Sequence, residues 1–309
     1  MVPRVFGLDQ EEMTLPMPRP LLLLIPLLVL LAGAGSGVEF QPPKDHEVGS
    51  AWSEEARWHS TGKTRIKLGL VKVRDKTHDE GISYFTDYSA LSMVRGQADV
   101  FRLAFREAST WEGDEARDVG LAGVELESTG LGDSQRFERI GDGRLVRKAR
   151  RFLDEHFSEG DPPPEEDDDE PDPIELMLPV GPVQPGDVWS LDMDEVERWA
   201  GPDDFQLDRE LCTSRIELLE IVDRDGESVG RFAYDVLLVP SMVKDVEFTE
   251  ARMAVHGTAE VPLSGAPELV SFDVEFAIRF VGRAEMRGVK ADIDMLSSTT
   301  GTLRRTPLR

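Results

Sequence analysis

The chain has 309 residues, 40% of them hydrophobic, which is enough for one large or two small domains with a true core. Its formal net charge of −25 repels phosphate backbones and anionic lipid surfaces, so nucleic acid is not an expected partner. Cys212 is the single cysteine, which excludes an internal disulfide, and we interpret it as a small buried apolar residue.

The first informative segment is the apolar run Leu21–Ala34, preceded by Arg19 and ending in small residues. This layout is typical of a secretory signal peptide, with cleavage expected after Ala34 and a start at either Met1 or Met17. A retained membrane anchor is the alternative. The run is shorter than the roughly 20 residues of a spanning helix and is interrupted by Pro26, which favours cleavage. We therefore expect a periplasmic or secreted protein with no membrane span once the leader is removed.

Beyond the leader, apolar and polar residues alternate with a period of two. Such alternation predicts antiparallel strands with one apolar and one solvated face. The runs that show it lie at 101–106, 216–222, 230–239, 253–261, 271–280 and 289–295. Two Asp-Gly pairs, at 142–143 and 225–226, predict hairpin turns, the first between 136–140 and 144–148. Helical periodicity is scarce and is confined to a short helix expected within 145–156.

The clearest break in the chain is residues 161–173, which contain five prolines and eight acidic residues. Because such a segment can neither bury apolar surface nor pair regularly, it is expected to be a disordered loop. It lacks the spaced ligands and glycine turn of a calcium loop. A basic run between 136 and 151 precedes it, and whether the loop lies against that run or both are simply solvated stays open. The sequence thus divides into a leader (1–34), an N-terminal β half (35–160), the acidic loop (161–173) and a C-terminal β half (174–309).

A short pattern recurs at an offset of 137 residues. It comprises Pro42, Gly49, Trp52 and Ser53, and again Pro179, Gly186, Trp189 and Ser190. Glycine permits a tight turn into a strand, and tryptophan three residues later can anchor that strand. The recurrence indicates either a duplication of the two halves or convergent turn chemistry.

The second copy carries a wider resemblance. Residues Leu178 to Asp192, LPVGPVQPGDVWSLD, resemble the Pro-Val-x-x-Gly-Asp-x-Trp pattern of a family of uncharacterised bacterial exported proteins, here at Pro182–Trp189. In that family a β-hairpin similar to Val124–Lys148 often comes before the pattern. The resemblance implies a curved antiparallel sheet similar to the half-barrel of periplasmic lipoprotein carriers, and it implies no chemistry.

Catalytic and metal signatures are weak. Gly226–Gly230 matches G-x-S-x-G, with Asp245 and His256 following in triad order, but Ser228 lies at a predicted hairpin rather than between a strand and a helix. The five histidines are scattered without ligand spacing, and paired carboxylates are expected from 60 acidic residues. We therefore expect neither an enzyme nor a metal or other cofactor.

The fold class predicted is mainly β, an antiparallel curved sheet or half-barrel with little helix. An apolar face of such a sheet must be covered, and if no helix covers it, the face is a groove for a ligand or partner. The sequence therefore predicts an exported, non-catalytic binding or carrier-like protein, with a structural or interaction module of the bacterial envelope as the alternative. The expected partner is an apolar ligand or an envelope protein. The predicted ligand-binding residues are Phe232, Tyr234, Val236, Phe272, Val274, Phe276, Ile278 and Phe280.

Overall fold

The computed structural model describes residues 37–41, 44, 46–68, 71–94, 97–130, 135–157, 179, 181–200, 205–224, 226–243, 246–286 and 289–308. The expected leader (1–34) and the acidic loop (161–173) lie outside these residues. Among the described residues, no helix has the length and apolar character needed to cross a membrane.

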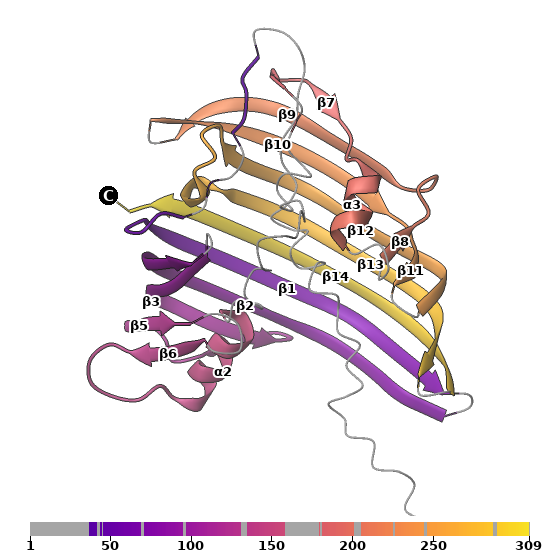
Figure 1. Cartoon of the computed structure of the whole chain (residues 1–309). Coiled ribbons are helices and arrows are strands. Elements are labelled where there is room, and N and C mark those ends of the chain that lie inside the picture. Colours follow the sequence, from indigo (N-terminus) through magenta and orange to yellow (C-terminus); the bar gives the residue numbers. More distant parts are fainter. Residues whose placement is uncertain are drawn as a thin grey trace, which may run out of the picture.

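One antiparallel sheet contains all the strands of the described residues (Figure 1). The first half of the chain supplies β1 (Ala51–Leu68), β2 (Val71–Val94), β3 (Gln97–Glu112), β4 (Glu115–Asp118), β5 (Val124–Thr129) and β6 (Arg136–Arg139). The second half supplies β7 (Val188–Trp189), β8 (Phe205–Leu207), β9 (Thr213–Arg224), β10 (Glu227–Leu238), β11 (Pro240–Val243), β12 (Val246–Pro262), β13 (Ser271–Met286) and β14 (Val289–Pro307). The predicted mainly-β, antiparallel fold class is confirmed.

The strand order places the first and last long strands side by side. The path runs β6-β5-β3-β2-β1-β14-β13-β12-β10-β9-β7, so β1 and β14 are neighbours in the middle of the sheet (Figure 1). They pair antiparallel from Trp52↔Pro307 to Leu68↔Ala291. In the described residues the terminal strands β6 and β7 do not pair with each other, so the sheet is open.

The helical segments within the described ranges are short: α2 (Arg147–His156), α3 (Met193–Ala200) and the 3-10 turn η4 (Pro267–Leu269). Helix α2 lies within the range in which a helix was expected. The hairpin predicted at Asp142-Gly143 is wrong, because after β6 and the positive-φ Gly143 the chain enters α2 instead of a second strand. β5 and β6 pair antiparallel, from Leu126↔Arg139 to Thr129↔Arg136.

The sheet has two chemically different faces, as the alternation predicted. We call the side that carries Phe272, Phe276 and Phe280 the apolar face, and the side that carries Asp273 and Glu275 the polar face. Cross-strand partners on the apolar face are Val255 opposite Phe276 and Met253 opposite Ile278, and all four side chains are buried. Both helices lie on the viewer's side of the sheet in Figure 1.

The recurring glycine–tryptophan pattern forms the same turn twice. Gly49 has φ 94° and Gly186 has φ 95°. In the first turn the Glu47 N–H donates to the Ser50 side chain, and in the second the Gln184 N–H donates to the Asp187 side chain. In both turns the donor lies two residues before the glycine and the acceptor lies one residue after it. The following strands differ, because β1 is 18 residues long and central, whereas β7 has two residues and lies at the edge.

Candidate functional site

All eight predicted ligand-binding residues share the apolar face. Phe272 to Phe280 alternate on β13, and Phe232, Tyr234 and Val236 alternate on β10, with β12 between the two strands. Each is at most 7% exposed, so together they form part of a buried layer. The same layer also includes Ile216, Leu218, Leu238, Met253 and Val255.

Some of the segments that cover this face lie within the described residues. The ring of Phe40, which lies outside the sheet, is centred 5.2 Å from the ring of Phe232. The ring of Trp189 packs edge-on against the same Phe232 ring, with 5.9 Å between ring centres. The adjacent chain is held by an isolated bridge between Val38 and Val183. On the other half of the same face, Phe152 of α2 and the following Phe157 pack on Tyr84. The face is therefore covered by short segments rather than by a second sheet in the described part of the chain.

A buried ionic group interrupts this apolar face where β1 meets β14. Glu54 is 4% exposed and lies directly opposite Arg305. Its carboxylate accepts hydrogen bonds from Arg305 Nε at 2.7 Å and from the Tyr84 hydroxyl at 2.7 Å. Burial and the negative charge of Glu54 raise the pKa of Tyr84 well above its ordinary value, so the phenol remains a donor.

An aromatic stack extends from this ionic group. Trp52 stacks on His46 at 4.0 Å and on Tyr88 at 4.9 Å. Burial, followed by the positive charge of Arg305, lowers the pKa of His46 and favours the neutral imidazole. Among the described residues, the Trp52 Nε1 atom is buried without a hydrogen-bond partner. The arrangement is that of a packed core.

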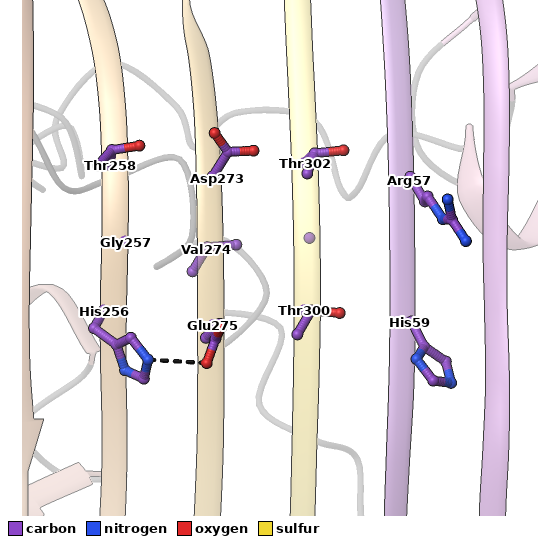
Figure 2. Close-up of a pocket in the computed structure, with 11 residues that line it drawn as sticks. Arg57, His59, His256, Gly257, Thr258, Asp273, Val274, Glu275, Thr300 and Thr302 are labelled. Atoms are coloured by element: carbon purple, nitrogen blue, oxygen red, sulfur yellow. Dashed lines mark hydrogen bonds and ion pairs between the residues drawn. The ribbon is translucent and has the colours of Figure 1, made fainter.

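The polar face carries a shallow hollow of about 340 Å³, which we call the polar hollow. Figure 2 shows its side chains on neighbouring strands, in two cross-strand rows. The first row is His256, Glu275, Thr300 and His59, and the second is Thr258, Asp273, Thr302 and Arg57. The sequence prediction missed this hollow, because it depends on the register among β12, β13 and β14 and on their pairing with β1, which is distant in sequence.

Most charged groups of the polar hollow are already partnered. His256 Nε2 lies 3.0 Å from Glu275 Oε2, and His59 Nε2 lies 2.8 Å from Asp79 Oδ1. Arg57 lies over the ring of Trp111, with 5.3 Å between Cζ and the ring centre. The two imidazoles stand three strands apart, roughly 14 Å, which is too far to share a metal ion. In the described residues, no three His, Cys, Asp or Glu side chains converge on a metal site.

The structure does not assemble the serine–histidine pair of the G-x-S-x-G motif. His256 pairs with Asp235 on β10, and Ser228 lies seven residues from Asp235 along that strand. At the rise of a β-strand, this places the two side chains roughly 23 Å apart. Asp245 lies outside the described residues. Cys212 is partly buried, and burial raises the pKa of its thiol, which keeps it protonated and unreactive.

Comparisons with known proteins give no family for this chain and only weak structural likenesses. No protein-family model matches the chain, and no curated protein matches it. A lipovitellin structure concerned with lipid–protein interactions is similar over 87% of this chain, at 9% identity and a TM-score of 0.32; the match spans 25% of the lipovitellin chain. An outer membrane channel from Pseudomonas putida F1 is similar over 89% of this chain and all of its own, at 10% identity and a TM-score of 0.20. Similarities this low carry no argument about function.

Proposed function

We propose that this chain is an exported, non-catalytic carrier that holds an extended apolar ligand, such as a lipid acyl chain, against the apolar face of its sheet. The observation that supports the proposal is the single open sheet, whose apolar face has no second sheet packed on it in the described residues. A sheet face covered by short segments can admit a ligand by moving those segments, whereas two sheets packed together cannot open without loss of the whole core.

The dimensions of the face suit such a ligand. Phe272 to Phe280 span roughly 27 Å along β13, and the apolar band crosses β9, β10, β12 and β13, roughly 14 Å in width. One leaflet of a bilayer offers about 15 Å of hydrocarbon, so a single acyl chain fits within this band. The polar hollow is less suitable as a principal site because its charged groups are mostly paired with one another.

The alternative is a structural or interaction module of the envelope. The observation that favours it is the burial of the face, since residues at most 7% exposed serve as an ordinary core in the absence of a ligand. The two functions differ in one measurable respect. A carrier exchanges an apolar small molecule in and out of this layer, and a structural module does not.

The test is native mass spectrometry of the full chain purified without detergent, together with titration of the apolar fluorescent probe N-phenyl-1-naphthylamine. A carrier is expected to retain lipid and to enhance probe fluorescence saturably. Ile278→Asn places a polar group on the apolar face and is expected to weaken probe binding. Ala277→Asn, on the exposed polar side of the same strand, is the matched control.

Circular dichroism tests whether both variants fold. If Ile278→Asn does not fold, Phe276→Leu is a milder substitution on the same face. Absence of bound lipid together with no saturable probe signal from the wild-type chain rejects the carrier. Equal probe binding by Ile278→Asn, Phe276→Leu and the control would also reject it, because the ligand would then lie elsewhere.

A further inference from the structure

The hairpin of β1 and β2 carries one of two concentrations of positive charge in this acidic chain, and the other is the basic run between 136 and 151. Residues 63–76 contain six basic residues and one acidic residue, in a chain whose net charge is −25. We call this segment the basic hairpin tip. Its cations are Lys63, Arg65, Lys67, Lys72, Arg74 and Lys76. The adjoining end of β13 and β14, residues 279–294, has four basic and three acidic residues and does not cancel the charge.

The tip projects beyond the neighbouring strand on one side. Pairing between β2 and β3 ends at Glu80↔Glu112, so in the described residues no strand pairs with the outer side of β2 nearer its start. Pairing between β1 and β2 continues to Leu68↔Val71, and this hairpin ends at the lower right of Figure 1. The basic side chains therefore lie at one end of the sheet, where β14 still flanks β1 but no described strand flanks the outer side of β2.

The geometry of the tip fits a broad anionic surface more closely than a small anion. In the cross-strand register, Lys63, Arg65, Lys67 and Lys72 lie on the polar face, whereas Lys76 lies on the other face. Arg65, Lys67, Lys72 and Lys76 are all exposed. Arg65 and Lys72 both pair with Asp75, and Arg65 also lies 3.9 Å from Asp294 of β14. Asp294 and Asp292, the carboxylates opposite Arg65 and Lys67, also pair with Arg279 and Arg283, so cations remain in excess at the tip. Charges spread around a projecting end can approach an extended surface together, but they do not converge on one point.

Protection of a free strand edge explains part of this pattern. Lysine on an exposed edge prevents pairing with another chain, and this accounts for Lys72 and Lys76 on β2. It does not account for Lys63, Arg65 and Lys67, because β1 is an interior strand paired on both sides. The excess on β1 therefore indicates a second role.

We propose that the basic hairpin tip docks this chain onto the surface of an anionic lipid bilayer. The choice of a bilayer over another polyanion rests on the proposed function, since an apolar ligand must be collected from or delivered to a lipid phase. Basic residues near an anionic surface attract it additively within a Debye length of about 8 Å at physiological salt. The acidic body is repelled, so the charge distribution also orients the chain with its tip toward the lipid.

The experiment is flotation of the full chain with vesicles of phosphatidylglycerol and phosphatidylcholine, and with vesicles of phosphatidylcholine alone. Because the apolar run Leu21–Ala34 can itself bind bilayers, the readout is the difference between the two vesicle types. We expect preferential binding to anionic vesicles at about 20 mM salt and its loss near 200 mM. Replacement of Lys67, Lys72 and Lys76 by Glu is expected to weaken that preference at least about tenfold.

The matched control is Arg144→Glu, Arg147→Glu and Arg150→Glu, which makes the same change in net charge at exposed residues in and just before α2. We expect this control to retain most of the preference. Equal loss in both triple variants would reject docking through the tip, as would the absence of any preference for anionic vesicles. Binding of heparin through the tip without vesicle binding would identify a soluble polyanion instead. The probe titration described above is independent of these results, so the carrier and the docking surface can fail separately.

Discussion

At the scale of single residues, the most consequential group is the buried Glu54–Arg305 pair. These residues face each other across β1 and β14, on a face that is otherwise mostly apolar. A two-residue slip in this pairing would place Glu54 opposite Leu303 or Pro307 and leave a buried carboxylate without a cation. We infer that the pair specifies the register in which the two central strands join.

Glu54→Gln should therefore be destabilising, because it removes the charge that compensates Arg305. Arg305 is 27% exposed, so part of its charge is solvated, and we expect a loss of about 2 kcal/mol in the free energy of unfolding. Glu55→Gln, at the next position on the exposed polar face, should change it by less than about 0.5 kcal/mol. Urea denaturation of both variants measures the difference, and equal stabilities would contradict the register role.

At the scale of strands, several glycines accept an aromatic ring from the neighbouring strand. The ring of Trp58 covers Gly301, where an added Cβ would come within 2.1 Å of ring carbon Cζ3. Trp111 covers Gly81 on the polar face in the same manner, at 2.2 Å. A ring lying flat over glycine shields the exposed backbone and allows the sheet to bend locally. The aromatic residues thus shape the strands as well as fill the core.

Gly301→Val should destabilise the protein by about 2 kcal/mol, because the new side chain and Trp58 cannot occupy the same space. Thr300→Val, on the exposed side of the same strand, should be nearly neutral. In the Trp58→Ala background the penalty of Gly301→Val should shrink, which a double-mutant cycle measured by thermal unfolding would show. An unchanged penalty in that background would mean that backbone conformation, and not the ring, requires glycine here.

These strands also show what the sequence can and cannot predict. Period-two alternation located β10, β12 and β13 because each strand has one buried and one solvated face. Helix α3 was missed because eight residues are too few to show a convincing helical period. Asp192 was a usable signal for the start of a helix, since its Oδ1 accepts a hydrogen bond from the Asp194 N–H there. The polar hollow and the Glu54–Arg305 pair depend on register between distant strands, which no local pattern records.

At the scale of the whole molecule, the two β halves expected from the sequence are parts of one sheet. The N-terminal half contributes β1 and the C-terminal half contributes β14, and these two strands pair along nearly their full length. Each strand has a second partner within its own half, β2 for β1 and β13 for β14. The joint between the halves is therefore the centre of the sheet, and separating them would create two long edges.

This arrangement predicts how fragments 35–160 and 174–309 behave. Alone, each should aggregate and lack a cooperative thermal transition, because its new edge strand, of 18 or 19 residues, is unpaired along its length. Co-expressed, they should purify together and regain a single transition, since pairing of β1 with β14 restores the core. Glu54→Gln in the first fragment should weaken that association more than Glu55→Gln does. A cooperative transition in either fragment alone would show instead that each half folds independently and that the joint is only an interface between two domains.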